Sequence, residues 1–500
     1  MKQILQDMSS GVTSVVECPA PVLMSNSMKI VTNVSLISAG TERMLVDFGK
    51  ASYIDKARQQ PEKVKMVLDK AITDGLVTTF EAVKSKLSQP LPLGYSNVGV
   101  VQEICPKVAG FQVGDRVVSN GAHADVVTVK RNLCARIPDD VDDDSAAFTV
   151  VGSIGLQGVR LAKPSLGESF VVIGAGLIGL LVIQLLRANG CRVLAVDFDG
   201  QKLELAAKFG AETCNPLSGG NAILQAGTLS RDRGVDGVII TASTKSNEPI
   251  KQAAQMCRKR GRIVLVGVIG LELDRADFYE KEISFQVSCS YGPGRYDSSY
   301  EDDGHDYPIG YVRWTEQRNF EAFLDLLSTG VVDVRPLISA RFEFTNAPAA
   351  YKELSSNSSG LGILLDYDSE MMGRLSRSVN ISNQYQFVGG SPTIGFIGAG
   401  NYASRILIPA FKKTGAQLHS LVTANGINSI IHGRNAGFLK ASTDVGAMLN
   451  ETAVNTVVIA TQHNTHAKYV VDSLNANKNV WVEKPLAIDR ESLSLIEEAY

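Results

Sequence analysis

Residues 171–179 read VVIGAGLIG, and this stretch decides the fold because an apolar run ends there in three glycines spaced as GxGxxG. The glycines are Gly174, Gly176 and Gly179, and the apolar segment that follows them runs to Gly190. The string alone is a weak signal, but a strand before it and a helix after it give it structural meaning. The first glycine permits a tight turn, the second lets the backbone approach a ligand, and the third allows close helix packing. The stretch therefore predicts a strand, a turn and a helix of a parallel α/β sheet.

The same turn predicts a dinucleotide site. Peptide N–H groups at the start of the helix, at Leu177 and Ile178, are suited to hold a pyrophosphate. The next strand ends in VLAVDFD, which places Asp197 roughly 20 residues on, where a carboxylate accepts hydrogen bonds from ribose hydroxyls. A 2′-phosphate would be repelled there, so NAD is favoured over NADP. In the alternative interpretation Asp197 only begins the turn before the next helix, although Asp199 is already a candidate N-cap.

Length and composition limit the remaining possibilities. The chain has 500 residues, more than one core supports, so we expect about three domains. A net charge of -3 gives no basic excess to hold nucleic acid. The first residues have no apolar signal segment, and the longest apolar run contains three glycines, so we expect neither secretion nor a membrane span. The seven cysteines are scattered without a CxxC pair, which favours reduced thiols in the cytoplasm.

The predicted fold class is α/β, because two series of strands alternating with helices follow a region of short strands with turn signals. The expected order is a β-domain over 1–149, completed by strands in 291–367; a Rossmann domain over 150–290; a linker over 368–391 with at most one short helix; and a second Rossmann domain over 392–500. Residues 53–89 interrupt the first domain with a helical pattern that includes Val64, Val67, Leu68 and Ile72. We expect a packed surface helix pair there, and a substrate lid or a subunit contact is the alternative.

Residues 1 to about 367 resemble the medium-chain dehydrogenase/reductase superfamily of the alcohol dehydrogenase type, in which a GroES-like β-domain accompanies a Rossmann domain. The matching strings are VGVVQEICPKVAGFQVGDRVV, AAFTVVGSIGLQGVRLAKPSLGESFVVIGAGLIG and FGAETCNP. The resemblance implies that the nicotinamide ring lies beside Thr149, near Thr241 to Ser243 and near Val268.

Zinc enzymes of this superfamily hold a catalytic metal, but the corresponding positions here are Ala39, Tyr95 and Thr149, in ISAGTE, GYS and FTVVG. None of these side chains is a good donor for Zn²⁺, and the cysteine-rich structural loop is missing as well. We therefore expect no metal. Other groups must manage the proton, and the candidates near this site are Glu42, Tyr95 and His123. Each has a structural alternative, since His123 could only bond backbone and Tyr95 could only fill the metal cavity.

A dense group of aromatic and arginine side chains follows in SYGPGRYDSSYEDDGHDYPIGYVRWTEQRN. Arginine suits phosphates or carboxylates and flat aromatic rings suit sugars or bases, which predicts a substrate loop. The residues expected to contact substrate are Tyr291, Arg295, Tyr296 and Arg313. In the alternative interpretation this is a packed loop whose arginines pair with Asp302, Asp303 and Glu316.

A second glycine turn occurs in residues 394–403, IGFIGAGNYA, with Gly398, Gly400, Asn401 and Tyr402 as the candidate phosphate-binding residues. Together with VNTVVIATQHNTHAKYVVDSLNANKNVWVEKPLAID, it closely resembles the Gfo/Idh/MocA family of sugar oxidoreductases. The resemblance implies that Glu483 and Lys484 lie at the cofactor, with Lys484 beside nicotinamide and substrate as a catalytic residue.

Two features of this second domain depart from that family. Its second strand ends in LVTANG, with Thr423 or Ala424 in place of an acidic ribose ligand, so NAD and NADP are both allowed. The chain also stops at Tyr500, before the family's substrate-binding sheet with its acid/base histidine, which predicts a partial module or a truncated sequence. The nearby imidazoles are His463 and His466, whose family counterparts line the cofactor pocket.

The pairing of the two parts resembles the bi-domain oxidoreductases, a group associated with surface polysaccharide synthesis. The leading hypothesis is a zinc-independent NAD(P)-dependent oxidoreductase that acts on a sugar or nucleotide-sugar alcohol or ketone. A zinc-free enone or quinone reductase and a non-catalytic dinucleotide-binding scaffold are the alternatives. The expected partner is a small-molecule substrate, with neither nucleic acid nor membrane, and a homo-oligomer is allowed because dimers and tetramers are common among relatives.

Overall fold

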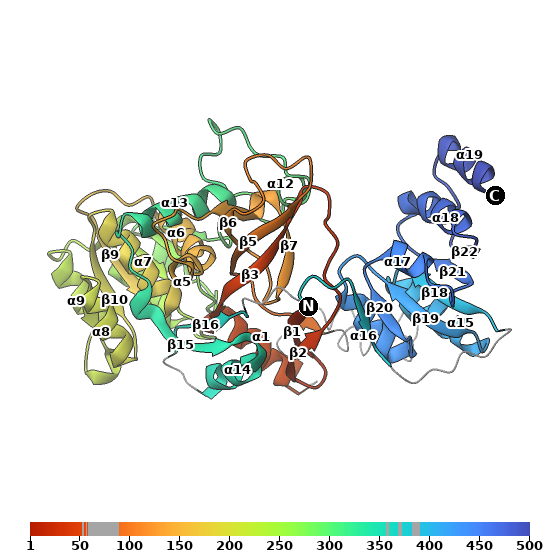
Figure 1. Cartoon of the computed structure of the whole chain (residues 1–500). Coiled ribbons are helices and arrows are strands. Elements are labelled where there is room, and N and C mark those ends of the chain that lie inside the picture. The colour runs from red at the N-terminus through yellow and green to blue at the C-terminus, as the bar shows by residue number, and fades with distance from the viewer. Residues whose placement is uncertain (53–54, 57, 59–89, 357–359, 369–372, 383–390) are drawn as a thin grey trace.

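The computed structural model in Figure 1 describes residues 1–52, 55–56, 58, 90–356, 360–368, 373–382 and 391–500. The predicted helical insert over 53–89, with Val64, Val67, Leu68 and Ile72, lies outside these residues except for three isolated positions. In the described part of the chain, no helix has the length and apolar character needed to cross a membrane.

The first β-domain is built on a mostly antiparallel sheet with one long strand at its centre. Its strands, in sheet order, are β15 (Ile338–Glu343), β16 (Gly362–Asp366), β3 (Ser27–Ser38), β5 (Asn97–Ile104), β6 (Arg116–Ser119) and β8 (Cys134–Arg136), and β7 (Val126–Lys130) also pairs with β3. Among the described strand pairs of this sheet, only β15 with β16 is parallel. Strand β16 pairs with β3 from Gly362 opposite Ser38 to Asp366 opposite Val34. The strings ARFEFT and GILLDY thus fall in strands that close the sheet of the N-terminal domain.

Smaller elements border this sheet. A second, three-stranded sheet is formed by β2 (Thr13–Glu17), β1 (Lys2–Gln6) and β4 (Leu91–Pro92). The helices of this part are α1 (Ala39–Lys50), α5 (Asp143–Ala146), α12 (Ser298–Glu301), α13 (Glu316–Ser328) and α14 (Ala347–Ser356). Helix α1 continues directly from the end of β3, so the side chains of its first turn are held at the edge of the sheet.

The central domain is a doubly wound parallel sheet, as the sequence predicts. The strands, in sheet order, are β11 (Glu212–Cys214), β10 (Arg192–Val196), β9 (Ser169–Ile173), β12 (Val235–Ile240), β13 (Cys257–Leu265) and β14 (Ser284–Val287). Along β9, Phe170 and Val172 pack into one buried cluster, whereas Val171 and Ile173 pack into another. Helices cover both faces: α6 (Thr149–Ala162) and α7 (Leu177–Ala188) on one side, α9 (Ala222–Leu229) and α10 (Glu248–Met256) on the other. The glycine turn follows β9, the strand at which the order reverses, where such sheets bind ligands.

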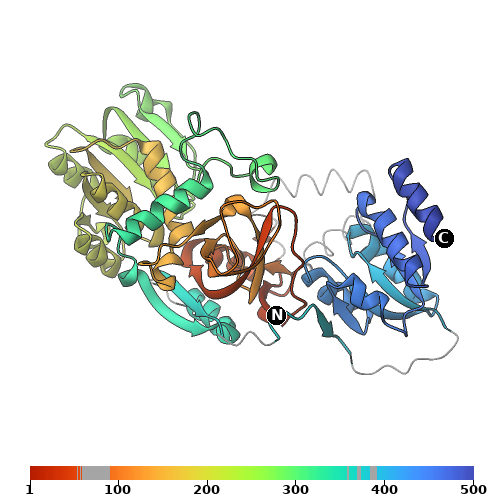
Figure 2. The same cartoon turned by 45° about the horizontal axis from the view of Figure 1, so that its top comes forward.

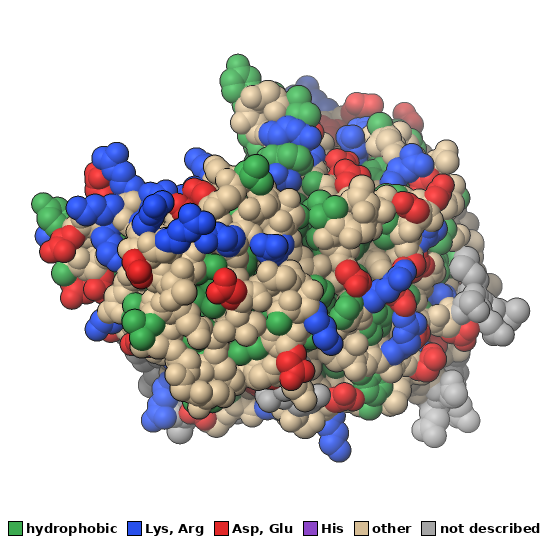
Figure 3. Space-filling view, turned by 90° about the vertical axis from the view of Figure 1, so that its left-hand side faces the viewer, with side chains coloured by type: hydrophobic (Ala, Val, Ile, Leu, Met, Phe, Trp, Pro, Cys, Tyr) green, Lys and Arg blue, Asp and Glu red, His purple; other side chains and the backbone are tan. Residues whose placement is uncertain are grey.

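Charged side chains at the opposite end of this sheet are paired locally. The N–O distances are 2.6 Å for Arg262 with Glu168, 2.7 Å for Arg258 with Asp236 and 2.8 Å for Arg260 with Glu282. On the face in Figure 3, a row of Lys and Arg side chains crosses the upper part and acidic side chains are scattered over the rest. The paired arginines lie where β13 begins, away from the glycine turn, and therefore stabilise loops at the other edge of the sheet.

The C-terminal domain is a second sheet of the same kind. The strands, in sheet order, are β17 (Ser378–Asn380), β20 (Lys440–Ser442), β19 (Gln417–Val422), β18 (Thr393–Ile397), β21 (Thr456–Ile459) and β22 (Asn479–Val482). Its helices are α15 (Ile408–Lys413), α16 (Ile427–Ala436), α17 (Val445–Leu449), α18 (His466–Asn475) and α19 (Arg490–Ala499). The segment 368–391, predicted as a linker, contains a strand, because β17 lies within it and pairs antiparallel with β20. The three residues of β17 are too few to show an alternating apolar pattern, so only the pairing with β20 defines this strand.

The first β-domain and the C-terminal domain share a buried apolar cluster. Met1, Leu5 and Cys18 of the former pack with Ile427 and Ile430 of α16. Figure 2 shows the two domains side by side, with the N-terminus close to the C-terminal domain. Because this cluster draws on both domains, they are joined by packing as well as by the connecting chain.

Candidate functional site

The glycine turn after β9 has the geometry expected of a dinucleotide site. Gly174 has φ +99°, and an added Cβ would lie 2.7 Å from the Ala242 nitrogen. At Gly179 an added Cβ would lie 1.9 Å from the carbonyl oxygen of Gly174, so the turn and helix α7 pack too closely for any side chain. At Gly176, by contrast, no atom lies within 4 Å of an added Cβ. Protein atoms therefore crowd the turn at Gly174 and Gly179 but leave space at Gly176. This space lies beside the backbone N–H groups of the first turn of α7, which have no partner within the helix.

Asp197, the predicted ribose ligand, lies against this turn. Its Oδ2 accepts a hydrogen bond from the Ala175 nitrogen at 2.6 Å, and its Oδ1 accepts one from the Asp199 nitrogen at 2.9 Å. Asp199, not Asp197, caps α8 (Gly200–Lys208), since its side chain accepts from the Gln201 nitrogen at 3.0 Å. Asp197 is therefore not needed as a helix cap and is held against the glycine turn, with lone pairs remaining for ribose hydroxyls.

The nicotinamide end of the predicted site contains buried hydroxyl groups. Thr149 and Ser153 lie one turn apart on α6, both are fully buried, and neither hydroxyl has a hydrogen-bond partner among the residues that the structure describes. Buried hydroxyls without partners are rare because each costs free energy. Thr241 Oγ1 donates to the Gly174 carbonyl oxygen at 2.6 Å, and Val268, 55% exposed, lies at the end of a short bridge to Ser243. The open glycine, the carboxylate and these hydroxyls together fit a nicotinamide dinucleotide.

The three positions that hold zinc in related enzymes lie in neighbouring segments. Ala39 is the first residue of α1, and Tyr95 reaches that turn with its hydroxyl 3.3 Å from Thr41 Oγ1. Ser96 Oγ donates to the Ala147 carbonyl oxygen at 2.6 Å, which ties the Tyr95 segment to the start of α6. Across the described ranges, no three His, Cys, Asp or Glu side chains are placed to hold a metal ion. The residues present at this site do not fit zinc.

Tyr95 is a half-buried phenol at the edge of this group. Burial raises its pKa to about 12, against the opposing effect of hydrogen bonds with Ser38 and with Thr41, to which the phenol donates. The phenol is therefore neutral at neutral pH and can donate a hydrogen bond to a substrate oxygen. Thr41 is exposed, so its hydroxyl connects the phenol with solvent.

Glu42 and His123 belong to a buried network behind Tyr95. His123 Nε2 lies 3.2 Å from Glu42 Oε2, and its Nδ1 lies 2.7 Å from Ser35 Oγ. The Ser38 nitrogen donates to Glu42 Oε1 at 3.0 Å, and the Tyr351 hydroxyl donates to Glu42 Oε2. Burial, and then the negative charge of Glu42, raise the pKa of Tyr351 well above its ordinary value. Since Glu42 and His123 are both 0% exposed, they hold the first turn of α1 in place but do not themselves contact solvent.

Replacement of Glu42 by Ala should strongly destabilise the first β-domain. The change leaves His123 Nε2 and the Tyr351 hydroxyl without their carboxylate partner, although His123 Nδ1 keeps Ser35 Oγ, and each unsatisfied buried group costs about 1–3 kcal/mol. Hydrogen exchange of the α1 amides under native conditions measures the loss. The control is Glu497→Ala at an exposed position of α19. An exchange rate in α1 as slow as that of the control would show that the hydrogen bonds of Glu42 do not stabilise this helix.

The predicted substrate loop is partly packed against itself. Arg295 pairs with Glu301 and lies 5.6 Å from the centre of the buried Tyr291 ring, and Arg318 pairs with Asp306. These carboxylates differ from those of the alternative interpretation, Asp302, Asp303 and Glu316. Tyr296 is 77% exposed, and the exposed Arg313 stacks over Trp314 at 3.8 Å. Of the four predicted substrate residues, Tyr296 and Arg313 are therefore accessible, whereas Tyr291 and Arg295 shape the loop.

Glu316, at the start of α13, should make stability depend on pH. It is 0% exposed, and burial, followed by the neighbouring Glu301, raises its pKa from 4.5 to about 8. The unfolded chain loses this proton as pH rises above 4.5, whereas the folded chain keeps it up to about pH 8. Between these values the unfolding free energy should fall by about 1.4 kcal/mol per pH unit from this group.

Urea unfolding of Glu316→Gln between about pH 4.5 and 8 tests this. The unfolding free energy of Glu316→Gln should not show this fall. The variant should therefore become more stable than the unmodified chain by an amount that grows steadily with pH. Glu497→Gln, on the exposed face of α19, is the matched control. Parallel pH curves for Glu316→Gln and the unmodified chain would show that Glu316 ionises normally.

The second glycine turn repeats the open geometry. Gly398 has φ +99°, and an added Cβ there would lie 2.3 Å from the Ala460 carbonyl oxygen, whereas no atom lies within 4 Å of an added Cβ at Gly400. Asn401 and Tyr402 follow and are both exposed, and the next turn is a π-helix over Ala403–Leu407. This turn therefore also fits a pyrophosphate.

Lys484 is exposed in the loop after β22, and Glu483 is half-buried beside it. The fully buried His466 fixes this loop, because its Nδ1 lies 2.8 Å from the Pro485 carbonyl oxygen and its Nε2 3.3 Å from the Thr461 carbonyl oxygen. His466 thus ties the Lys484 loop to the end of β21, and His463 beside it is exposed.

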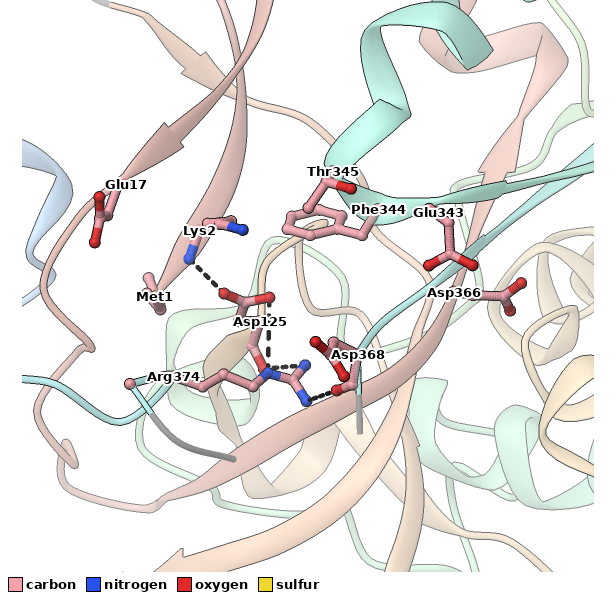
Figure 4. A pocket seen from close by; sticks show the side chains of 11 residues that line it. Met1, Lys2, Glu17, Asp125, Glu343, Phe344, Thr345, Asp366, Asp368 and Arg374 are labelled. Atoms are coloured by element: carbon pink, nitrogen blue, oxygen red, sulfur yellow. Dashed lines mark hydrogen bonds and ion pairs between the residues drawn. The ribbon is translucent and has the colours of Figure 1, made fainter. Parts of the chain in front are cut away.

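A separate pocket of about 370 Å³ lies near the N-terminus (Figure 4). Asp125 Oδ2 accepts a hydrogen bond from the backbone nitrogen of Lys2 at 2.5 Å, and its Oδ1 lies 3.7 Å from Arg374 Nε. Arg374 also donates to the Asp368 carbonyl oxygen at 2.7 Å. The charged groups on this side of the pocket bond to one another and join β1 to the segment after β16.

Comparison with known proteins gives one family match in each of the two parallel-sheet domains. Residues 178–302 match the family model described as zinc-binding dehydrogenase, and residues 393–499 match the oxidoreductase family with an NAD-binding Rossmann fold. The chain is 23% identical to 2-dehydro-3-deoxy-L-galactonate 5-dehydrogenase of Pseudoalteromonas atlantica, over 57% of this chain and 85% of that protein. It is 28% identical to D-guloside 3-dehydrogenase of Escherichia coli, over 52% of this chain and 73% of that protein.

Among solved structures, the alcohol dehydrogenase TADH from Thermus sp. ATN1 superposes with a TM-score of 0.57 at 20% identity, covering 74% of this chain and 100% of that one. This likeness supports the fold of the first two domains. The chain is thus an oxidoreductase that is similar to zinc-binding dehydrogenases over residues 178–302 and to the oxidoreductase family with an NAD-binding Rossmann fold over residues 393–499.

Proposed function

We propose that the first site is a zinc-independent, NAD-dependent dehydrogenase/reductase for a sugar-type alcohol or ketone, with Tyr95 as the proton donor. The observation that carries the proposal is the place of Tyr95: a neutral phenol stands at a metal-ligand position and is hydrogen-bonded to the exposed Thr41. Ala39 and Thr149 at the two other positions leave the substrate oxygen to an organic donor.

For ketone reduction, a dihydronicotinamide held at the first glycine turn would supply the hydride that the carbonyl carbon receives. Tyr95 donates its phenolic proton to the carbonyl oxygen, which becomes the alcohol. Thr41 then passes a proton from solvent to the phenolate. A phenol whose pKa is raised to about 12 stays protonated at neutral pH, so the proton that reduction needs is present, whereas the phenolate that oxidation needs is scarce.

A polyhydroxylated substrate is supported by two observations. Two of the similar proteins are named for a galactonate and a guloside. The accessible Arg313 and Tyr296 offer a cation and an aromatic face, which suit an acidic sugar or the phosphates of a nucleotide sugar. We infer a sugar acid, glycoside or nucleotide sugar, such as surface polysaccharide synthesis uses, as the substrate class.

Preference for NAD is part of the proposal. Asp197, fixed by the Ala175 and Asp199 nitrogens, would repel a 2′-phosphate. Replacement of Asp197 by Ala should reduce the ratio of kcat/KM with NADH to that with NADPH by about tenfold or more. If that ratio did not change in Asp197→Ala, the ribose would have to bind elsewhere.

Steady-state assays with NADH on a panel of keto sugars, sugar acids, nucleotide sugars and a plain quinone test the substrate class. Turnover of a polyhydroxylated ketone, with the quinone much poorer, supports the proposal. Preferred turnover of the quinone would instead indicate a zinc-free quinone reductase. Tight NAD binding without turnover of any substrate would favour a dinucleotide-binding scaffold.

A further inference from the structure

The strand order of the C-terminal sheet fixes where an adenine nucleotide would lie. The order is β20, β19, β18, β21, β22 beyond the edge strand β17, so the sheet reverses between β19 and β21, at β18 and its glycine turn. In such a sheet the pyrophosphate lies at the glycine turn and the adenosine ribose meets the end of the next strand along the chain. That strand is β19, and the residues after it are 423–426.

A segment of the first β-domain is hydrogen-bonded to this same edge. The Val22 nitrogen donates to the Ala424 carbonyl oxygen at 3.0 Å, directly after β19. After β20, Thr443 Oγ1 donates to the Ala20 carbonyl oxygen at 2.7 Å. The Ala20 nitrogen in turn donates to the Ser376 carbonyl oxygen at 2.8 Å, in the segment before β17. Residues 19–22 therefore cross the edge of the sheet at which the adenosine is expected.

This contact is close and specific. Gly426 has φ +72°, and an added Cβ would lie 2.1 Å from the Pro19 carbonyl oxygen, so only glycine allows the two segments to approach. Ala20 is 1% exposed and Thr443 is 3% exposed, which shows that the hydrogen bond between them is sealed from solvent. We call residues 19–22, 424–426 and Thr443 together the seam. The seam is therefore packed as closely as the interior of a domain.

The end of β19 also lacks the usual ribose ligand. Instead of a carboxylate it carries Thr423, whose Oγ1 accepts a hydrogen bond from the Ser429 nitrogen at 3.2 Å. The carbonyl oxygen of Ala424 is already engaged by Val22. Part of the surface that borders an adenosine here therefore comes from the other domain.

We propose that residues 19–22 of the first β-domain form one side of the adenosine subsite at the second glycine turn, so that an adenine nucleotide binds where the two domains meet. Binding and the seam are then thermodynamically linked: the nucleotide stabilises the seam, and the seam raises the affinity for the nucleotide by the same factor. The inference concerns the second turn only and does not rest on the chemistry proposed for Tyr95.

Hydrogen exchange of the full chain tests the proposal. The first site is silenced by Gly176→Ala, because the added methyl group enters the space where a pyrophosphate would lie. AMP, which carries the adenosine half, should slow exchange at the Ala20 and Val22 amides, whereas nicotinamide mononucleotide should not. Adding Gly400→Ala, the equivalent change at the second turn, should abolish the effect of AMP.

Three results would overturn the proposal. Faster exchange at Ala20 and Val22 with AMP would mean that the segment blocks the subsite and is displaced. Unchanged exchange there, with AMP slowing exchange only in residues 398–404, would mean that the subsite belongs to the C-terminal domain alone. Absence of any AMP or NAD binding in Gly176→Ala would also overturn the proposal.

A pair of matched variants supplies an independent readout. In the Gly176→Ala chain, Thr443→Val removes the hydroxyl that bonds Ala20 while preserving volume, and should weaken AMP binding roughly threefold to tenfold. The control is Thr456→Val, which removes an exposed hydroxyl bonded only within the C-terminal domain, to Asn455 Oδ1 at 2.9 Å. Equal AMP affinities in calorimetric titrations of the two variants would show that the seam does not contribute.

Discussion

Replacement of Tyr95 by Phe is expected to lower kcat for ketone reduction by about 10²- to 10⁴-fold, the range over which a positioned proton donor accelerates a reaction. The dissociation constant for NADH should not change, since Tyr95 lies beside α1 and not at the glycine turn. Stopped-flow measurement of NADH oxidation gives the rate of the hydride step, and fluorescence titration gives the affinity. The matched control is Tyr279→Phe, a phenol that is 65% exposed at the end of α11 (Arg275–Tyr279).

The dependence on pH distinguishes a chemical from a structural role of Tyr95. Burial raises the pKa of this phenol to about 12, so ketone reduction should vary little between about pH 6 and 9. Alcohol oxidation needs the phenolate and should rise about tenfold per pH unit over the same range. In Tyr95→Phe that rise should disappear. A plateau of the oxidation rate near neutral pH, or turnover equal to that of Tyr279→Phe, would assign proton transfer to another group.

Replacement of Gly176 by Ala is expected to weaken NAD binding at the first site by about 100-fold or more, because the new methyl group occupies the place of a pyrophosphate oxygen. The fold should tolerate the change. Gly176 has φ -70°, and no protein atom lies within 4 Å of the added Cβ. Calorimetric titration with NAD measures the affinity, and the melting temperature reports the integrity of the chain.

Gly310→Ala serves as the control, because Gly310, like Gly176, has no atom within 4 Å of an added Cβ but lies outside the Rossmann domain. Its NAD affinity should equal that of the unmodified chain. If Gly176→Ala bound NAD as tightly as Gly310→Ala when both variants also carry Gly400→Ala, which blocks the second turn, the pyrophosphate would not lie at the first turn. A fall in melting temperature with Gly176→Ala alone would show that the glycine has a packing role instead.

The glycine turns could be predicted because their signals are local. A buried strand, three glycines and an apolar helix are consecutive in the sequence, and the packing that requires Gly179 is with Gly174, only a few residues away. The role of Asp199 as helix cap, which leaves Asp197 for the ribose, follows from the same short stretch. Family resemblance added the comparison with zinc enzymes, which singled out Ala39, Tyr95 and Thr149.

Features that depend on distant parts of the chain could not be predicted. The sequence predicts Glu42 as a catalytic candidate, and the structure encloses its carboxylate by a bond with Tyr351 that joins helices far apart in the sequence. Arg295 and Glu301 are only 6 residues apart, but which of the nearby carboxylates Arg295 pairs with depends on how the loop folds at α12. The seam at residues 19–22 consists mainly of backbone hydrogen bonds, which leave no pattern of residue types in the sequence.

Zinc analysis of the active full-length chain tests whether ketone reduction proceeds without a metal ion. The chain is treated with a chelator, its zinc content is measured by mass spectrometry, and NADH-dependent reduction of the preferred sugar ketone is assayed in the same sample. We predict that the rate is the same before and after treatment and that the active chain holds no zinc. One tightly bound zinc ion per chain, whose removal abolishes turnover and whose return restores it, would contradict the account.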